Sequence, residues 1–247
     1  MTKRVLITGG SSGVGKSLVE HLSGEFEVIT LARRLHQLES HFSNNEHVHY
    51  FEQDLSDLQN LSGVIQRINA EHGPISYLIN NAAINEKSSL MNLNSDNLRR
   101  SFSINTIAPI LIIRSLIDKM SIQNFGRIIN ITSGASINCP TNSAPYNSSK
   151  AALNAATVTM AKEVSGKNIK INLMSPGPVR SEMAPKAPLN PEVCHPTVDY
   201  LLSIDADGPT GRFFWLGKEI PLHPNLQGLD WASGVATDRF DRILTDE

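Results

Sequence analysis

Short runs of apolar and β-branched residues alternate along the chain with longer stretches in which apolar residues recur every three or four positions. The short runs predict strands at 5–8, 28–31, 48–51, 77–79, 127–131 and 169–174. The longer stretches predict helices at 14–22, 58–68, 107–120 and 144–164. Strands and helices that alternate in this way form parallel sheets with right-handed crossovers. The predicted fold class is therefore α/β.

The predicted architecture is a Rossmann-type, doubly wound parallel sheet flanked by helices, in which ligands bind beyond the carboxyl ends of the strands. The 247 residues show no internal repeat or linker, and 40% are hydrophobic while 19% are charged. That composition supports one substantial core, so we expect a single domain over 1–247. Five prolines between 178 and 196 interrupt the periodicity. We expect this irregular segment to form either a substrate lid at 182–210 or an ordered surface excursion.

Charge and cysteine content narrow the partners and the compartment. The formal net charge is −2, from 22 Lys and Arg against 24 Asp and Glu, which argues against a nucleic-acid or anionic-membrane partner. Cys139 and Cys194 are too few for a disulfide framework. The first apolar run is too short for a signal peptide, and the stretch 104–117 is shorter than the ~18 residues of a membrane span. We expect a cytoplasmic protein with a small-molecule partner, no membrane and no nucleic acid.

A glycine-rich turn separates the first predicted strand from the first predicted helix. It reads Thr-Gly-Gly-Ser-Ser-Gly-Val-Gly over 8–15, and backbone N–H groups at such a turn can hold a pyrophosphate. The pattern T-G-x-x-x-G-x-G resembles the fingerprint of the short-chain dehydrogenase/reductase family. The resemblance implies cofactor contacts from Gly9, Ser11, Ser12, Gly13, Val14 and Gly15.

The same turn also matches a second motif, the P-loop pattern G-x-x-x-x-G-K-[ST] over 10–17. In a kinase or NTPase, Lys16 would reach the β- and γ-phosphates and Ser17 would bind Mg²⁺. Such an enzyme also needs an aspartate that holds the metal after a hydrophobic strand. Asp54 is the one early candidate, and it follows a polar Glu-Gln pair. The turn by itself favours a dinucleotide without deciding between the two.

The end of the second predicted strand bears on the choice of dinucleotide. An NAD enzyme places an acidic residue there to bond the adenosine 2′-hydroxyl, whereas a 2′-phosphate needs cations and no nearby carboxylate. Here Ala32 takes the acidic place, and Arg33 and Arg34 follow. Guanidinium groups bind phosphate well, so we expect NADP(H) to be preferred over NAD(H). The alternative is a solvated basic start to a helix.

Two further blocks resemble the family's cofactor-binding motifs. Asp54-Leu55 matches its adenine-binding pair, although an aspartate there is also a common helix cap. The sequence Asn-Asn-Ala-Ala over 80–83 resembles the family's N-N-A-G, with alanine in place of glycine, and could otherwise be an asparagine-rich turn. The resemblance implies cofactor contacts from Asp54, Leu55, Asn81, Ala82 and Ala83.

Three residues form a candidate proton-transfer group. Tyr146 and Lys150 are four residues apart on a predicted helix, so their side chains share one face. An ammonium group beside a phenol, together with the charge of a nicotinamide, lowers the pKa of the phenol toward neutrality. Ser133 precedes Tyr146 by the spacing that the family shows, and its hydroxyl can stabilise charge on the substrate oxygen. Asn105 corresponds to the family asparagine that holds a water behind Lys150, and otherwise suggests a helix cap.

The last matching block lies at 176–181 and resembles the family's P-G-x-x-x-T segment beside the nicotinamide carboxamide, with serine in place of threonine. It implies cofactor contacts from Tyr146, Lys150, Pro176, Gly177, Val179 and Ser181. The resemblance covers 3–181, and the remaining chain departs from the family pattern. We expect Phe213, Phe214 and Trp215 to be core or subunit-interface residues rather than a substrate platform. The sequence leaves the substrate unidentified.

The resemblance implies an NADP(H)-dependent oxidoreductase that interconverts a carbonyl and an alcohol by hydride transfer, with Tyr146 as general acid and base. It also implies a homo-oligomer, a dimer or a tetramer, built through the two long helices. The eight histidines show no metal-ligand spacing, so no metal is expected. Two alternatives stay open, a P-loop NTPase or kinase and a non-catalytic dinucleotide sensor. The joint presence of Ser133, Tyr146 and Lys150 argues against the sensor.

Overall fold

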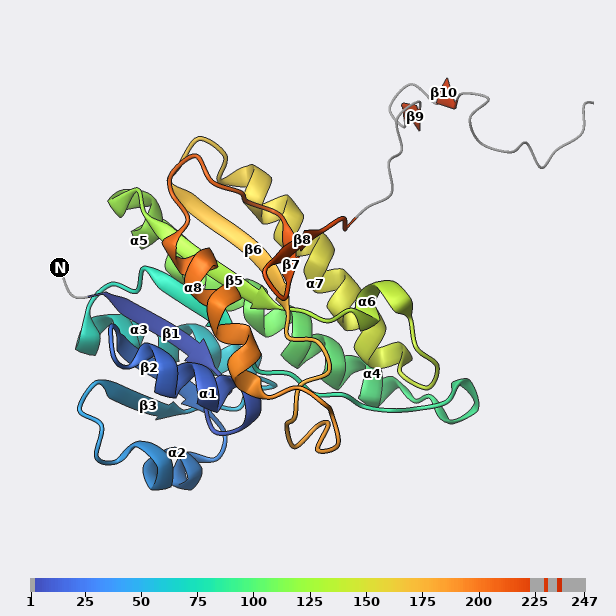
Figure 1. Cartoon of the computed structure of the whole chain (residues 1–247), viewed down its shortest axis with the longest axis horizontal. Coiled ribbons are helices and arrows are strands. Elements are labelled where there is room, and N and C mark those ends of the chain that lie inside the picture. Colours follow the sequence, from blue (N-terminus) through green and yellow to red (C-terminus); the bar gives the residue numbers. More distant parts are fainter. Residues whose placement is uncertain (1–2, 223–228, 231–234, 237–247) are drawn as a thin grey trace, which may run out of the picture.

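The computed structural model describes residues 3–222, 229–230 and 235–236, and an eight-stranded sheet runs through its centre (Figure 1). The strand order is β3-β2-β1-β4-β5-β6-β7-β8, and all neighbours are parallel except β7 and β8. The strands are β1 (Arg4–Thr8), β2 (Glu27–Ala32), β3 (Val48–Glu52), β4 (Tyr77–Asn80), β5 (Gly126–Ile131), β6 (Ile169–Ser175), β7 (Phe213–Trp215) and β8 (Lys218–Ile220). A separate antiparallel pair joins β9 (Leu229–Asp230) and β10 (Val235–Ala236). The six predicted strands and the doubly wound α/β class are confirmed.

Helices cover both faces of the sheet (Figure 1). They are α1 (Gly13–Leu22), α2 (Leu35–Phe42), α3 (Leu58–His72), α4 (Ser95–Phe102), α5 (Ala108–Gln123), α6 (Ala135–Asn138), α7 (Ala144–Glu163) and α8 (His195–Ser203). Alternate residues of a strand face opposite sides, and β1 shows this: Val5 and Ile7 join a core with α1, α2 and α8, while Leu6 joins one with α3 and α5. This two-sided burial explains why the strands are continuous apolar runs.

The helix predicted to begin at 107 is part of a longer helical run, Ser95–Gln123. A π-helical segment, η2 (Ser103–Ile107), joins α4 to α5. By length and by a mean hydropathy of 1.3 over its most apolar part, this run could cross a membrane, and half of that part is buried inside the protein. Ile112 and Leu116 pack with Leu61 and Ile65 of α3, as the core helix of a folded domain does. The run is longer than the helix predicted over 107–120 because α4 and the π segment continue directly into α5.

The expected lid segment, 182–210, is irregular at its two ends, over 182–190 and 204–210. Its middle forms a short 3₁₀ helix, η3 (Pro191–Cys194), followed by α8. Val198 and Leu201 of α8 are fully or almost fully buried in the core. The lid thus stays a prediction for the loop before η3 alone.

Helix α8 also contacts two other elements. His195 Nε2 lies 2.8 Å from Ser17 Oγ of α1, and the His195 ring stacks on that of His21 at 4.0 Å. Thr197 Oγ1 accepts a 2.9 Å hydrogen bond from the Gly217 N–H, in the turn between β7 and β8. Helix α8 therefore contacts both α1 and the β7–β8 hairpin.

The C-terminal hairpin only partly matches the sequence-based expectation. Phe213 and Phe214 are buried, as predicted for core residues, whereas Trp215 is 38% exposed. Trp215 is thus not a core residue of the described chain. Trp231, in the divergent tail, lies outside the described residues.

Candidate active site

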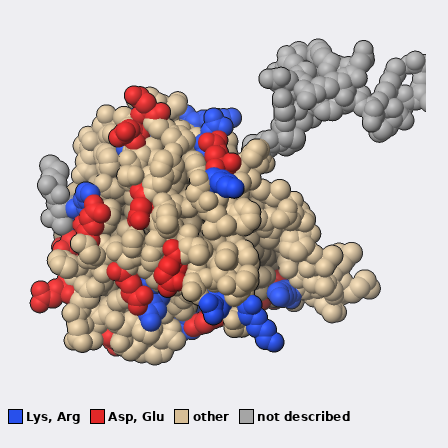
Figure 2. All heavy atoms as spheres, in the orientation of Figure 1, with Lys and Arg blue, Asp and Glu red and all other residues tan. Residues whose placement is uncertain are grey.

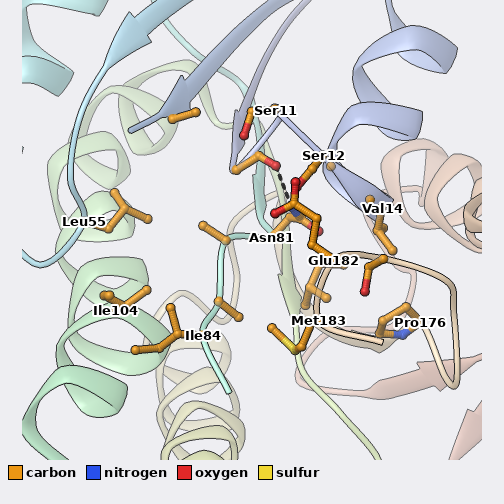
Figure 3. Close-up of a pocket in the computed structure, with 18 of the residues that line it drawn as sticks. Ser11, Ser12, Val14, Leu55, Asn81, Ile84, Ile104, Pro176, Glu182 and Met183 are labelled. Carbon is orange, nitrogen blue, oxygen red and sulfur yellow. Dashed lines mark hydrogen bonds between the residues drawn. The ribbon is translucent and has the colours of Figure 1, made fainter. Parts of the chain in front are cut away.

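A cavity of about 380 Å³ opens at the carboxyl ends of strands β1 to β6. It is lined by every residue predicted as a cofactor or catalytic residue except Asn105. The lining is completed by residues that were not predicted as cofactor or catalytic residues: Leu31, Ala32, Gln53, Ile84, Ile104, Ile131, Thr132, Glu182, Met183 and Ala184. Figure 3 shows Glu182 beside Ser12 of the glycine turn, with Leu55, Ile84 and Ile104 across the cavity.

The glycine turn after β1 leaves no room for larger residues. A Cβ on Gly15 would lie 2.1 Å from the Gly9 carbonyl oxygen. Gly9 and Gly13 have φ of 76° and 55°, a region in which glycine carries no steric cost. A Cβ on Gly13 would also lie 3.0 Å from Ser181 Cβ, so the segment after β6 lies against the turn. This close packing requires glycine at these positions of the turn, directly before and within the start of α1.

The predicted Asn-rich segment after β4 is bound to the same turn. Thr8 Oγ1 accepts 3.0 Å hydrogen bonds from the backbone N–H groups of Asn81 and Ala82. Asn81 Nδ2 donates to the carbonyl oxygens of Thr8 and Gly9, at 3.0 and 3.3 Å. These hydrogen bonds hold the segment after β4 against the glycine turn.

The N-terminus of α1 is suited to an anion. Its first residue follows Ser12, which makes no side-chain capping bond, and its first turn has no acidic residue. Uncapped N–H groups at a helix N-terminus attract phosphate groups through the helix dipole.

The two P-loop residues do not contribute to that site. Lys16 Nζ lies 3.6 Å from Glu20, Ser17 is bonded to His195, and neither side chain lines the cavity. The geometry gives the NTPase alternative no support.

Each of the two arginines after β2 has a carboxylate beside it. Arg34 donates to both carboxylate oxygens of Glu182, at 3.1 and 2.9 Å, and to Ser12 Oγ at 3.2 Å. Arg33 lies 4.0 Å from Asp54. The sequence-based argument for a 2′-phosphate assumed no nearby carboxylate, and this assumption was wrong. The contact could not be foreseen, because Glu182 is 148 residues from Arg34 in sequence.

Asp54 is held by its own turn. Its Oδ1 accepts hydrogen bonds from the Ser56 N–H and hydroxyl, at 2.8 and 2.7 Å. Burial raises the pKa of Asp54, and the Ser56 bonds and Arg33 outweigh this effect, so the pKa is lowered overall. Asp57, rather than Asp54, caps α3.

Ser133, Tyr146 and Lys150 meet in the cavity, at the end of β5 and the start of α7. Lys150 is 2% exposed, its Nζ donates to the Ile131 carbonyl oxygen at 2.7 Å, and burial lowers its pKa to about 7. Burial raises the pKa of Tyr146, and a hydrogen bond with Ser133 lowers it in part. The sequence predicted a lowered pKa for Tyr146. That prediction included the charge of a nicotinamide, whereas in the chain itself burial dominates and the Lys150 ammonium is bonded to Ile131.

A buried hydrogen-bond chain holds the backbone at Ser133. Thr132 Oγ1 donates to Asn154 Oδ1 at 2.6 Å, and Asn154 Nδ2 donates to Ser136 Oγ at 2.8 Å. Ser136 Oγ in turn donates to the Ser133 carbonyl oxygen at 2.7 Å. Asn154 lies one turn after Lys150 on α7. The helix that carries Tyr146 and Lys150 therefore also carries the residue that supports the backbone at Ser133. Sequence reasoning missed Asn154, since an asparagine inside a helix gives no local signal of a distant partner.

Asn105 lies behind the cavity rather than in it. Its side chain is fully buried, accepts from the Ile84 N–H at 2.9 Å, and donates to the Ile84 carbonyl oxygen and to Ser149 Oγ. The helix-cap alternative is wrong, because Asn105 sits inside the π segment of the continuous helical run. Its role in a proton relay stays a prediction. Within the described ranges, no three His, Cys, Asp or Glu residues are grouped to hold a metal ion.

Comparisons with known proteins agree with this geometry. A family model described as short chain dehydrogenase matches residues 3–191. L-xylulose reductase of Caenorhabditis elegans is 32% identical over 187 residues, which cover 73% of this chain and 73% of that protein. The 3-oxoacyl-[acyl-carrier-protein] reductase FabG of Rickettsia bellii (strain RML369-C) is 32% identical over 192 residues, covering 73% of this chain and 74% of that protein.

Solved structures show the same fold. A structure of 4-hydroxyisoleucine dehydrogenase complexed with NADH matches with a TM-score of 0.82 at 25% identity, over 87% of this chain and 96% of that one. A structure of ElxO with NADP bound matches with a TM-score of 0.79 at 24% identity, over 87% of this chain and 97% of that one. The two structures hold different nicotinamide dinucleotides, so the choice between them must come from the residues of this chain.

Proposed function

The chain belongs to the short-chain dehydrogenase family, and on that premise we propose that it is an NADP(H)-dependent oxidoreductase interconverting a carbonyl and an alcohol, with Tyr146 as general acid and base. One observation carries the proposal. Tyr146, Ser133 and Lys150 line the same cavity as the glycine turn and the two arginines. The proposed proton donor, the stabilising hydroxyl and the proposed dinucleotide site then lie in one cavity.

The cavity residues fit a dinucleotide. The tight turn and the uncapped start of α1 would take the pyrophosphate, and Leu55 with Asp54 would border the adenine. Pro176, Gly177, Val179 and Ser181 would border the nicotinamide. A bound nicotinamide supplies the hydride donor or acceptor.

The chain's own residues would handle the proton and the charge on the substrate oxygen. Tyr146 Oη delivers or removes the proton of that oxygen, while the Ser133 hydroxyl hydrogen-bonds to it and stabilises developing charge. The buried Nζ of Lys150, held by the Ile131 carbonyl, carries the cation that favours phenolate in its neighbour.

Arg33 and Arg34 support the preference for NADP(H). A 2′-phosphate beside them would accept charge-assisted hydrogen bonds that a 2′-hydroxyl cannot match. Arg34 would exchange its bidentate partner, giving up Glu182 for the phosphate. The preference therefore depends on how tightly Glu182 holds Arg34.

The remaining parts of the proposal concern partners and place. The partner is a small carbonyl or alcohol substrate, the protein acts in the cytoplasm, and it is a homo-oligomer formed through α5 and α7. Figure 2 supports a small-molecule partner over nucleic acid, because acidic and basic side chains are interspersed on the face shown.

The test of function combines binding and turnover. Side by side, we expect NADPH to bind more tightly than NADH, and Arg34→Ala to weaken NADPH far more than NADH. Tyr146→Phe should lower reduction of any accepted carbonyl at least about a hundredfold while leaving NADPH affinity nearly unchanged. Retained turnover in this variant would remove Tyr146 from its assigned role. ATP binding that needs Mg²⁺ and is lost in Lys16→Ala would instead support an NTPase.

A further inference from the structure

A second cavity, of about 550 Å³, lies beside the first. The two share Ser133 and Gly177, so the second cavity begins where the proposed reaction takes place. It is enclosed by the segment after β5, the segment after β6 and the β7–β8 hairpin. Its larger apolar lining residues are Ile137, Pro178, Phe213, Trp215 and Ile220.

The hairpin holds Trp215 in a defined position. Leu216 and Gly217 both have positive φ, 47° and 72°, which is the geometry of a tight two-residue hairpin turn. The Gly217 N–H is bonded to Thr197 of α8, a residue that is 2% exposed. On its other side the indole lies against Gly177, where a Cβ would be 2.5 Å from Trp215 Nε1. The indole thus forms a wall fixed by the turn, by α8 and by the segment next to the proposed nicotinamide site.

The lining of this second cavity excludes charge. Among the described residues it contains no Lys, Arg, His, Asp or Glu, and its polar side chains are those of Ser133, Asn138 and Ser175. The surface over α6 in Figure 2 likewise carries no acidic or basic side chain. A charged group moved from water into such a space would lose its hydration without an ionic partner. An apolar group would gain, as it does in the cavities of this size that hold small molecules.

The exposed side chains at the rim have the same character. Ile137 is 44% exposed and Trp215 is 38% exposed, and both line the cavity. Large apolar side chains that lie exposed beside a cavity are typical of ligand-binding sites, whereas single scattered ones are ordinary surface.

We propose that the second cavity binds the non-reacting part of the substrate, that this part is uncharged and apolar, and that Trp215 selects it. The substrate class is thus an aromatic or alicyclic ketone, or the matching secondary alcohol, rather than a sugar, a phosphate ester or a carboxylate. This inference rests on the proposed function for the reaction itself. Trp215 acts on specificity and takes no part in proton transfer.

The test compares two ketones that share the reacting group. Acetophenone is neutral, and 4-acetylbenzoate adds a carboxylate at the far end of the ring. With NADPH as reductant, we expect kcat/KM for acetophenone to exceed that for 4-acetylbenzoate at least about tenfold. Equal or faster reduction of 4-acetylbenzoate would overturn the proposal.

Variants then assign the effect to the indole. Trp215→Ala should lower kcat/KM for acetophenone about tenfold, through KM, and should change that for acetone less than about threefold. Trp215→Phe should keep most of the activity, and Lys218→Ala, exposed on the same hairpin and outside the lining, should match the wild type. Equal losses for both ketones in Trp215→Ala would contradict a role in specificity.

A binding measurement separates this proposal from the proposed function. Ligand-observed NMR with the NADPH-free protein should show saturable binding of acetophenone, weaker binding of 4-acetylbenzoate, and loss of the former in Trp215→Ala. Such binding without turnover would contradict the proposed reaction and leave the cavity assignment standing. Absence of saturable acetophenone binding, as would follow if another part of the chain filled the cavity, would overturn the assignment.

Discussion

At the scale of single residues, the proposed ribose end of the cavity contains opposed charges. Arg34 faces both oxygens of Glu182, and Arg33 faces Asp54. A phosphate that arrives here does not meet free guanidinium groups and must displace a carboxylate from one of them. The strength of that ion pair therefore sets part of the affinity for the cofactor.

Replacing Glu182 with glutamine should raise the affinity for NADPH. Both side chains of the pair are partly exposed, at 37% for Arg34 and 58% for Glu182, and such a pair stabilises by ~0.2–1 kcal/mol. Since 1.4 kcal/mol is about a factor of ten, we expect a gain of up to about fivefold for NADPH and none for NADH, measured by fluorescence titration. Glu192→Gln, which is not in the cavity lining, serves as the control. Equal gains for both dinucleotides would contradict the exchange at Arg34.

The buried Lys150 should make stability depend on pH. Burial lowers its pKa from 10.5 to about 7 in the folded chain, so between these values the unfolded chain binds more protons. Stability must then rise with pH above 7, by up to about 1.4 kcal/mol per unit from this group. In urea titrations at pH 7, 8 and 9, the unfolding free energy of the wild type should increase relative to that of Lys150→Met. Lys162→Met, exposed on the same helix, should show no such trend, and a difference that is flat with pH would refute the lowered pKa of Lys150.

At the scale of elements, local patterns predicted well what depends on neighbouring residues. The strands followed from apolar runs, and the meeting of Tyr146 and Lys150 followed from helical spacing. Contacts between distant segments could not be predicted in this way: Arg34 with Glu182 spans 148 residues, and Thr132 with Asn154 spans 22. The β7–β8 hairpin was missed because strands of three residues carry too little periodicity to detect.

The link between α7 and the end of β5 leads to a kinetic prediction. Asn154→Leu breaks the bonds to Thr132 and Ser136, so the backbone that carries Ser133 loses its support. We expect kcat for a ketone to fall about tenfold while NADPH affinity changes little. Thr159→Val, on the exposed side of α7, should keep full activity. A lowered melting temperature with unchanged kcat would mean that Asn154 is only structural.

At the scale of the whole molecule, the long helical run leaves apolar side chains outside the core. Ile107, the last residue of η2, is 38% exposed and directly precedes α5. Burying such surface against a second copy would be favourable. This agrees with the proposed assembly through α5 and α7.

Light scattering after gel filtration should give two or four times the mass of the single chain. Ile107→Arg should shift that mass toward one chain, because a buried charge without a partner opposes association. Leu90→Arg, in the short 3₁₀ helix η1 (Leu90–Asn92) outside α5 and α7 and 85% exposed, should leave the assembly intact. A wild-type protein with the mass of one chain would rule the assembly out.

Helix α8 has one consequence for how the enzyme could change over time. Its first residues touch the helix that begins at the glycine turn, and Thr197 holds the hairpin that carries Trp215. Helix α8 therefore supports both the proposed dinucleotide site and the proposed substrate site at Trp215. A shift of α8 that changed one of these sites would also disturb the other. New substrates are therefore more easily gained by substituting side chains that line the second cavity than by moving the helix.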